Sequence, residues 1–257
     1  MQFIDTHCHL DDERYTHDID KVLENASKLG VTHCIIPAAN PNTLERAKML
    51  ANTYNGVYFA CGLHPCDIEH ENATSMDYLA FLNDKKCVAI GECGLDYYHL
   101  DSSKDIVAQK QRQKEVFIAQ IERAINAKLP LIIHIREASQ DAYEILSSFP
   151  QAYGVLHCYN ADQILLKLSD RFYYGIGGVA TFKNARRLIE VLPRIPISRI
   201  VFETDAPYLT PHPHRGTRNS PEYIPLIAHR VAEVLGVDLG HLAETTTQNA
   251  KKLFCLG

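Results

Sequence analysis

The sequence lacks the features that mark several large classes of protein. No apolar run approaches the roughly 20 residues that a membrane-spanning helix needs. Residues 1–2 lead straight into an apolar segment, without the basic region of a signal peptide. No two cysteines have the Cys-x-x-Cys spacing of a structural zinc ribbon, and no Ser/Gly-rich linker divides the chain. We therefore expect a soluble, cytoplasmic protein with a single domain over residues 1–257.

Basic residues are also in the minority. The chain has 26 Lys and Arg against 31 Asp and Glu, for a net charge of -5. This balance argues against a general polyanion binder, although a local basic rim and bound metal could still hold a nucleic acid. The eight cysteines are mostly scattered through strand-like segments, which indicates reduced core thiols in a cytosolic protein. We favour a monomer.

The sequence does contain a regular alternation of short apolar segments and helix-like segments. The predicted strands begin at residue 3 and then cover 31–36, 57–61, 87–90, 131–133, 154–156, 172–176 and 200–202. The predicted helices cover 19–29, 43–53, 76–83, 109–127, 138–148, 161–168, 185–192, 221–235 and 239–253, with a polar loop at 97–107. This alternation predicts an α/β fold with a parallel sheet. Eight strands in 257 residues favour a closed (β/α)₈ TIM barrel. An open sheet would usually carry a Gly-rich loop after its first strand, where this chain has His-Cys-His-Leu-Asp.

Two histidines one residue apart close the first strand. Because side chains alternate between faces along a strand, His7 and His9 project the same way if the extended path continues. Two imidazoles on one side can bind a divalent metal ion. A single histidine in such a place is more often structural, so the pair alone decides nothing.

Further ligand-type residues recur at the ends of other strands, and this recurrence favours a metal centre. They are Glu92, His134, His157 and Asp205. The carboxyl ends of barrel strands meet at one rim, and neighbouring strands lie about 5 Å apart, so His134 and His157 can reach one ion. The eighth strand adjoins the first, which brings Asp205 near the first two histidines. A glutamate at position 92 could bridge two ions.

The expected catalytic residues are Glu92 and Asp205. Asp205 could orient or deprotonate an attacking water, while Glu203 is either a partner behind a ligand or a further ligand. The expected substrate contacts are His64, Arg136, Arg215 and Arg218. For the arginines, phosphate binding suits the guanidinium group, but a salt bridge to a ligand carboxylate or a solvated surface loop explains them equally well.

Mixed histidine and carboxylate ligands suit Mg²⁺, Zn²⁺ or Mn²⁺. Two such ions would activate a water and stabilise a leaving oxygen, which is the chemistry of phosphate-ester hydrolysis. Two other interpretations stay open. The same barrel could carry a metal-dependent deacylase or amidohydrolase acting on a small ester or amide, or the chain could be a metal-binding protein without enzymatic activity.

Taken together, the motifs resemble the TatD family of metal-dependent deoxyribonucleases, which are amidohydrolase-like barrels. The matching segments are 3–11, 62–65, 91–96, 130–136, 157–158, 203–207 and 215–219. The resemblance implies one metal ion on His7, His9, Glu92 and Asp205 and another on Glu92, His134 and His157. It also implies Mg²⁺-supported 3′→5′ exonuclease action on DNA, which we expect to concern single-stranded ends.

The chain departs from the family pattern at two places. Tyr159-Asn160-Ala161 stands where the family usually has an aromatic residue followed by Ser-Gly. Ser220-Pro221 stands where the family usually has Glu-Pro. Neither change removes an implied metal ligand, but both fall in loops expected at the barrel mouth, where they bear on substrate preference.

Overall fold

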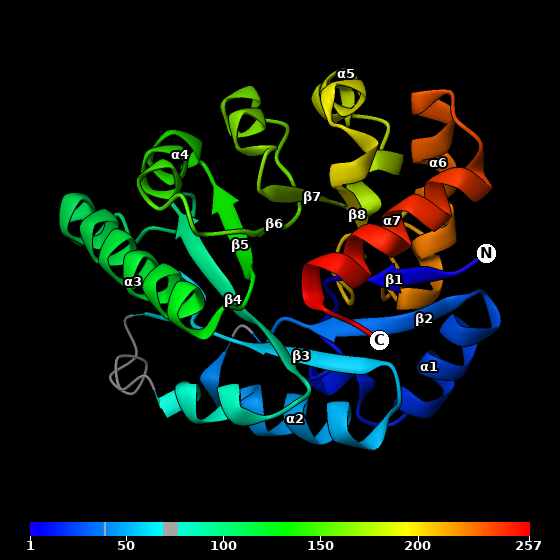
Figure 1. Ribbon diagram of the computed structural model, residues 1–257, viewed down its shortest axis with the longest axis horizontal. Helices are drawn as coiled ribbons and strands as arrows, with labels where there is room; N and C mark the ends of the chain where they lie inside the picture. Colours follow the sequence, from blue (N-terminus) through cyan, green and yellow to red (C-terminus); the bar gives the residue numbers. More distant parts are fainter. Residues whose placement is uncertain (39, 69–76) are drawn as a thin grey trace.

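The computed structural model describes residues 1–38, 40–68 and 77–257, and the strands among them form one eight-stranded sheet (Figure 1). The strands are β1 (Phe3–Asp5), β2 (Val31–Ile36), β3 (Val57–Cys61), β4 (Cys87–Asp96), β5 (Leu131–Arg136), β6 (Gly154–Leu156), β7 (Phe172–Ile176) and β8 (Ile200–Phe202). Their order in the sheet is their order along the chain, and each neighbouring pair runs parallel.

Backbone contacts close the sheet between its first and last strands. The amide of Thr6 donates to the carbonyl of Phe202 at 3.0 Å, and the amide of His9 donates to the carbonyl of Ala206 at 2.7 Å. Cys8 and Ala206 form a parallel bridge. The predicted (β/α)₈ barrel is therefore confirmed, and its closure brings the segment after β1 against the segment after β8.

Helices surround the strands (Figure 1). The α-helices are α1 (Ile19–Lys28), α2 (Leu44–Thr53), α3 (Ile106–Ala127), α4 (Ser139–Ser148), α5 (Arg186–Val191), α6 (Ile224–Leu235) and α7 (Leu239–Phe254). Short 3₁₀ helices are η1 (Glu13–Tyr15), η2 (Pro41–Thr43), η4 (Asp77–Asn83), η5 (Gln163–Leu168), η6 (Gly178–Thr181), η7 (Leu192–Arg194), η8 (Ile197–Arg199) and η9 (Pro221–Tyr223). No helix in the described parts of the chain combines the length and the apolar composition that a membrane span requires.

Local signals in the sequence explain where several helices begin and end. Asp105 caps α3, because its side chain accepts hydrogen bonds from the amides of the first turn. Gly236 ends α6 in a left-handed conformation, with φ of 65°. Gly30 stands between α1 and β2 with φ of 88°, and a Cβ there would lie 2.4 Å from the carbonyl oxygen of Met1. Only glycine fits that turn without strain.

Several strands and helices differ from the prediction in extent or type. Strands β4 and β5 extend to Asp96 and Arg136, beyond the predicted ends at residues 90 and 133, because the two strands pair from Cys93 with Ile133 onward. The glycines and charges of 91–96 had indicated a loop, but pairing overrides local propensity. The described part of 76–83 is the 3₁₀ helix η4, residue 76 lies outside the described residues, and within 161–168 only η5 is helical. The predicted loop at 97–107 is shorter, because Asp105 caps α3, which begins at Ile106. The predicted helix at 221–235 begins with the 3₁₀ helix η9.

An apolar core fills the barrel interior. Each strand contributes at least one buried residue, including Ile4, Ile35, Ala60, Ala89, Ile132, Val155, Tyr173 and Val201. Leu253 and Phe254 of α7 belong to the same cluster. The side chain of Asn249 in α7 donates to the carbonyl of Ile200 at 2.8 Å, at the start of β8. Helix α7 therefore covers the amino end of the barrel, and the carboxyl ends of the strands are left for a functional site.

Candidate metal centre

The first two candidate ligands, His7 and His9, follow directly on β1. Their ring centroids are 5.1 Å apart, and their Nε2 atoms lie 3.8 Å and 3.3 Å from Oδ1 of Asp205. The amide of Asp205 donates to the carbonyl of His7 at 2.9 Å, so barrel closure itself sets this spacing. Asp205 has a positive φ of 56°, a strained conformation for a residue that is not glycine and one that recurs at functional sites.

Asp5 anchors this part of the site, although the sequence analysis did not single it out. Its Oδ1 accepts hydrogen bonds from the amides of His7 at 3.2 Å and Thr204 at 3.0 Å. Its Oδ2 accepts from the hydroxyl of Thr204 at 2.6 Å. Burial raises the pKa of Asp5 to about 7, against the lowering effect of these hydrogen bonds. The sequence did carry one signal for Asp5, which is a charged residue at the end of an apolar strand.

Glu92 lies in the middle of the candidate ligands. Its Oε2 is 3.4 Å from Nε2 of His7, and its Oε1 is 3.0 Å from Nδ1 of His134. Oε1 is also 3.9 Å from Nε2 of His157. Burial raises the pKa of Glu92, but the surrounding histidines, among them His7 and His64, outweigh it and hold the pKa well below its usual range. The carboxylate is ionised and contacts both groups of ligands, as a bridging ligand would.

His134 lies within β5 and His157 directly follows β6, and each ring lies between the centre and an outer carboxylate. Nε2 of His134 is 2.9 Å from Oδ2 of Asp96, on the opposite edge of the ring from Glu92. Nδ1 of His157 is 3.0 Å from Oε1 of Glu203. Carboxylates behind metal-binding histidines fix the orientation of the ring. These contacts favour Glu203 as a partner behind His157, the first of its two predicted alternatives.

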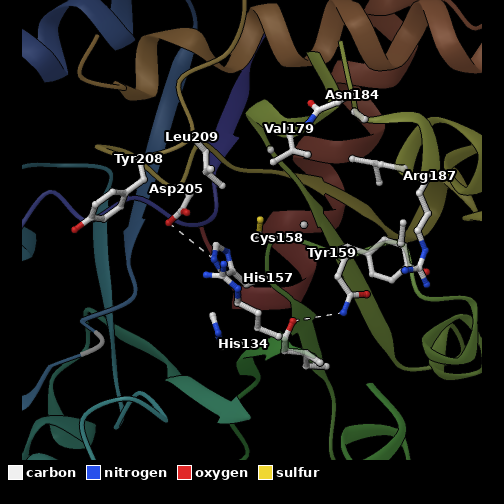
Figure 2. A pocket seen from close by; sticks show the side chains of 18 residues that line it. His134, His157, Cys158, Tyr159, Val179, Asn184, Arg187, Asp205, Tyr208 and Leu209 are labelled. Carbon is white, nitrogen blue, oxygen red and sulfur yellow. Dashed lines mark hydrogen bonds and ion pairs between the residues drawn. The ribbon is translucent and has the colours of Figure 1, made fainter. Parts of the chain in front are cut away.

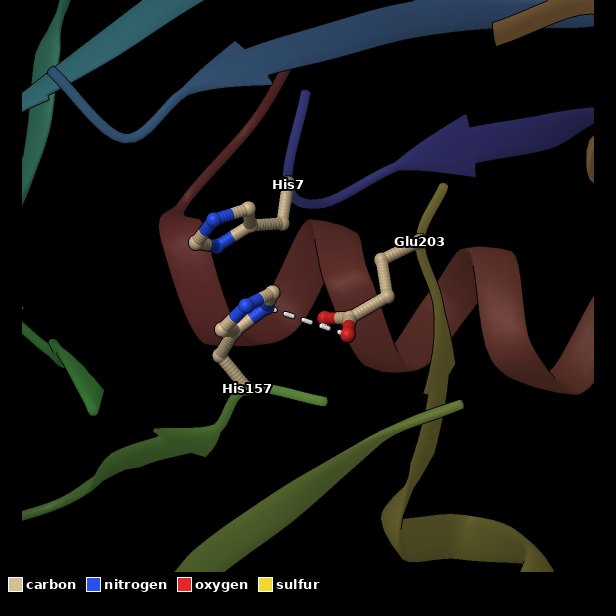
Figure 3. Close-up of side chains that lie close together, drawn as sticks. All are labelled: His7, His157 and Glu203. Carbon is tan, nitrogen blue, oxygen red and sulfur yellow. Dashed lines mark ion pairs between the residues drawn. The ribbon is translucent and has the colours of Figure 1, made fainter. Parts of the chain in front are cut away.

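The rings of His7 and His157 pack face to face across the barrel. Their centroids are 3.4 Å apart with an interplanar angle of 13°. Figure 3 shows the two rings stacked, with the carboxylate of Glu203 reaching the edge of His157. Burial opposes protonation of His157, but Glu203 and then Glu92 raise its pKa to about 10. Burial and the neighbouring His157 lower the pKa of His7.

His64 lies closer to the centre than its predicted role as a substrate contact requires. Its Nε2 is 3.6 Å from Oε1 of Glu92, and its ring centroid is 4.5 Å from that of His134. The ligand atoms of these three residues lie within 4.8 Å of one another. Burial lowers the pKa of His64 to about 4, although Glu92 acts to raise it. A neutral imidazole suits either metal ligation or a hydrogen bond to substrate.

Unpaired buried atoms show that the site suits a cation. Neither ring nitrogen of His7 has a hydrogen-bond partner in the described parts of the chain, and the same holds for Nδ1 of His157 and Oε2 of Glu203. A buried polar atom without a partner costs about 1–3 kcal/mol. A divalent ion would satisfy the lone pair of the neutral His7 ring, and imidazole with carboxylate is a donor set for Zn²⁺, Mn²⁺ or Mg²⁺. The residues present therefore fit a divalent metal.

All three candidate phosphate-binding arginines lie over aromatic rings, and the guanidinium of Arg218 lies 4.6 Å from the ring centroid of Tyr15. The guanidinium of Arg136 lies 3.9 Å from the ring centroid of Tyr98, at the end of β5 beside the centre. The guanidinium of Arg215 lies 3.9 Å from the ring centroid of Phe182 and donates to the carbonyl of Thr210 at 2.9 Å. The substrate contacts of Arg136 and Arg215 stay predictions, and Arg136 is the better placed of the two because it also lines the cavity described below.

Arg218 is also held by a carboxylate. Its guanidinium donates to both oxygens of Asp18, at 2.9 Å and 2.5 Å, and to the carbonyl of Arg14. These contacts tie the loop after β8 to η1 and to the residue that precedes α1. They give Arg218 a structural role, so its predicted phosphate contact would require exchange of the Asp18 pair.

A cavity of about 590 Å³ opens beside the centre, with His134, His157 and Asp205 in its wall (Figure 2). Its other walls are partly apolar, through residues such as Val179, Leu188 and Leu209, and partly polar, through Asn160, Asn184 and Arg187. Tyr208 stands at its edge with 48% of its surface exposed, and the guanidinium of Arg14 lies 4.5 Å from its ring centroid. The sequence analysis missed Tyr208, because an isolated tyrosine in a loop carries no pattern.

Comparison with known proteins places the chain in a family. A family model described as TatD related DNase matches residues 4–255. The chain belongs to the TatD family. The uncharacterized metal-dependent hydrolase YabD of Bacillus subtilis is 38% identical over 97% of this chain and 98% of its own length. The uncharacterized metal-dependent hydrolase YcfH of Escherichia coli K12 is 35% identical over 99% and 96%.

Solved structures agree with this assignment. The crystal structure of YjjV, a TatD homologue from Escherichia coli K12, superposes with a TM-score of 0.89 at 29% identity, covering 99% of this chain and 98% of that one. The chain is therefore a metal-dependent hydrolase of the TatD family, and its candidate ligands converge at the rim where TIM-barrel enzymes carry their chemistry.

The two departures from the TatD pattern differ in their relation to the cavity. Tyr159, Asn160 and Ala161 all line the cavity beside the centre. The side-chain amide of Asn160 donates to the hydroxyl of Ser139 at 3.0 Å. Ser220 is not part of the cavity lining, and its amide donates to the side chain of Asn219 at 2.8 Å. The first departure changes the shape of the cavity wall, and the second changes the support beneath the mouth loop.

Proposed function

We propose that this TatD-family hydrolase cleaves phosphodiester bonds in DNA, as a Mg²⁺-supported 3′→5′ exonuclease on single-stranded ends. The observation that carries the proposal is the position of Glu92. One buried carboxylate contacts His7 on one side and His134 on the other, at 3.4 Å and 3.0 Å. Such a carboxylate is the natural bridge between two ions, and two-ion centres are widespread among nucleases and phosphatases.

The proposed ligand sets divide around this bridge. His7, His9 and Asp205 would hold one ion together with Glu92, and His134 and His157 would hold the other with the same carboxylate. Bound divalent ions would supply Lewis-acid activation of water and electrostatic stabilisation of the leaving oxygen. The protein supplies the orientation of the ligands through Asp96 and Glu203, which lie behind the two outer histidines.

Asp205 is the proposed acceptor for the proton of the attacking water. Burial raises its pKa, but contacts with His9, His157 and His7 outweigh burial and lower the pKa overall, so the carboxylate is ionised at neutral pH. Its Oδ1 faces the histidines, and the residue also lines the cavity where a substrate would enter. A group that accepts a proton must lie within hydrogen-bond reach of the water and of the reacting bond.

The surroundings of the centre support a nucleic acid as substrate. Tyr98 and Tyr208 are 55% and 48% exposed, and each has an arginine over its ring. Exposed aromatic rings beside guanidinium groups provide stacking for unpaired bases and charge for phosphates. The cavity of about 590 Å³ is of the size that small-molecule ligands occupy. It could therefore take a terminal nucleotide.

The test is a screen of metals against substrates with purified protein. Single-stranded DNA labelled at either end would be incubated with Mg²⁺, Mn²⁺ or Zn²⁺, and the released products would be separated. We expect mononucleotides to be released stepwise from the 3′ end only when a divalent ion is present. His134→Ala should abolish release, because it removes an ion ligand. His241→Ala, at the opposite end of the barrel, is the matched control and should keep full activity.

The same screen tests the alternatives. Small esters and amides would be assayed under identical metal conditions. Turnover of an acyl substrate without release of nucleotides from any DNA end would replace the nuclease proposal with the deacylase. Absence of turnover with every substrate, in protein shown to bind its ions, would favour the metal-binding protein without activity.

A further inference from the structure

A second cluster of metal-binding side chains lies beyond the centre described above. Cys66 follows β3 by a few residues, and His99 follows the end of β4. Between them lies Asp96, whose carboxylate is fully buried at the end of β4. The thiol, the carboxylate and the imidazole offer one ligand atom each, and these three atoms lie within 4.8 Å of one another.

The carboxylate of this cluster is held firmly in place. Oδ1 of Asp96 accepts hydrogen bonds from the amides of Tyr98 at 3.0 Å and His99 at 2.9 Å. Oδ2 lies 2.9 Å from Nδ1 of His99 and 2.9 Å from Nε2 of His134. One oxygen therefore faces both the outer cluster and a candidate ligand of the main centre. Cys66 and His99 are both exposed, so their side chains can adjust around this fixed oxygen.

We propose that Cys66, Asp96 and His99 form a third metal site, selective for Zn²⁺ and other ions that bind thiolates. Tetrahedral zinc, with Zn–S of about 2.3 Å and Zn–N of about 2.0 Å, separates its ligand atoms by roughly 3.5 Å. The ligand atoms of the cluster lie within 4.8 Å of one another, so shifts of the exposed side chains would reach that spacing. A thiolate and a carboxylate together neutralise a divalent ion, and sulfur with imidazole discriminates against Mg²⁺.

A cavity beside the cluster leaves room for a fourth ligand. It has a volume of about 260 Å³, and Cys66 and His99 form part of its wall, together with Gln109 and Arg112 of α3. Three protein ligands with one open position would let water or a small anion complete the tetrahedron. Because Asp96 also contacts His134, the third site would share a carboxylate with the main centre, although it does not depend on the substrate proposed for that centre.

Cobalt titration tests this site, because Co²⁺ replaces Zn²⁺ and reports a sulfur ligand by a thiolate-to-metal charge-transfer band in the near ultraviolet. The purified, metal-free full chain would be titrated with Co²⁺, and bound metal would be counted after gel filtration. We expect the charge-transfer band to appear in the wild-type protein. It should be lost in Cys66→Ser together with one equivalent of tightly bound cobalt, and His99→Ala should weaken that equivalent at least tenfold.

Matched variants separate this site from the rest of the molecule. Cys255→Ser and His229→Ala change an exposed cysteine and an exposed histidine far from the cluster along the chain, and both should leave the band and the metal count unchanged. Excess Mg²⁺ should not remove the band. A wild-type protein without a thiolate band at saturation, or a band that survives Cys66→Ser, would overturn the proposal. Neither result bears on nuclease activity, which the screen above measures separately.

Discussion

The two sides of the metal centre are built differently. On the β1/β8 side, His7, His9 and Asp205 come from the segments that close the barrel, and the ring nitrogens of His7 have no hydrogen-bond partner in the described parts of the chain. On the β5/β6 side, His134 and His157 each have a carboxylate behind them, at 2.9 Å and 3.0 Å. The ring of His134 is held by hydrogen bonds to Glu92 and Asp96 without a cation. The ring nitrogens of His7 have no such bond within the described residues, and Nδ1 of His157 meets Glu203 only as an ion pair.

This difference separates two ways of making a binding site. Outer carboxylates hold a ring in place before any ion arrives, so the β5/β6 side should change little on metal binding. The buried, unpaired ring of His7 instead carries a desolvation cost that a cation would remove. Glu92 belongs to both sides, because its two oxygens face His7 and His134. Substitutions can therefore be ranked by whether they affect both sides, one side or neither.

The largest effect should follow from Glu92→Gln, which changes the one ligand that both sides share. The amide keeps the shape of the side chain but loses the charge that would bridge two ions. We expect the catalytic rate to fall at least about a thousandfold, which corresponds to roughly 4 kcal/mol of barrier. Steady-state kinetics and metal analysis on the same preparation check this. Two retained ions with activity within tenfold of wild type would show that Glu92 is not the bridge.

Metal removal should expose the difference between the sides as a difference in stability. An ion at a hundredfold excess over its Kd raises the free energy of unfolding by about 2.7 kcal/mol, and calorimetry with and without chelator measures this gain. His7→Asn should reduce the gain but cost little in the metal-free protein, because the ring nitrogens of His7 have no hydrogen bond to lose within the described residues. His134→Asn should destabilise the metal-free protein too, because contacts to Glu92 and Asp96 are lost. An equal loss of unfolding free energy in the two metal-free variants would contradict the proposed difference between the two sides.

The metal-dependent gain in the free energy of unfolding should also depend on pH. The protonation of the histidines decides whether it rises or falls with pH. Burial lowers the pKa of His9, His134 and His157, but the neighbouring carboxylates outweigh it and raise all three, with His157 at about 10. These groups hold protons in the metal-free protein that metal binding must displace. Stabilisation by metal should therefore be larger at pH 8 than at pH 6. A gain that is independent of pH over this window would show that the histidines are not ligands.

A glycine behind the β5/β6 side gives a more selective test. A Cβ at Gly175 would lie 2.1 Å from Oε2 of Glu203, so Gly175→Ala must displace that carboxylate and release His157. Loss of such a partner typically lowers metal affinity 10–100-fold. Gly177→Ala is the matched control, because its Cβ would meet the same glutamate at 3.4 Å, an ordinary contact. Metal affinity would be measured by competition with a chelating dye. Equal affinities in the two variants would show that Glu203 does not orient His157.

The sequence predicted this architecture because its signals were local. Alternating apolar and helical segments indicated the barrel, and the rule that barrel chemistry lies at strand ends brought His7, Glu92 and Asp205 to one rim. The extent of β4 was wrong, since the glycines and charges of 91–96 favour a loop until β5 pairs with them. With that strand extended, Glu92 and Asp96 fall on one face. The role of Asp96 behind His134 could not be predicted without that pairing.

The sequence could not predict which partner a long charged side chain contacts. Arg136 and Arg218 look equivalent as phosphate-binding candidates when only their positions near strand ends and in loops are known. In the structure one guanidinium lies over Tyr98 beside the cavity, and the other is paired with Asp18. Competing partners for a long charged side chain lie far apart in the sequence, and only the fold decides which one it meets.

The smallest effect should come from Arg218→Gln, which tests whether the comparison extends to these arginines. The Asp18 pair is partly exposed, with about a third of each side chain or more open to solvent, and such pairs contribute about 0–1 kcal/mol. We expect kcat/KM on single-stranded DNA to stay within about threefold of wild type, because a guanidinium that neutralises Asp18 has little capacity left for phosphate.

Arg136 is the comparison, because its guanidinium has no such carboxylate partner among the described contacts. Arg136→Gln should raise KM about tenfold with little change in kcat. The reverse order of effects, measured at one salt concentration, would mean that the Asp18 pair opens when DNA binds and that the substrate crosses the β1/β8 side of the mouth.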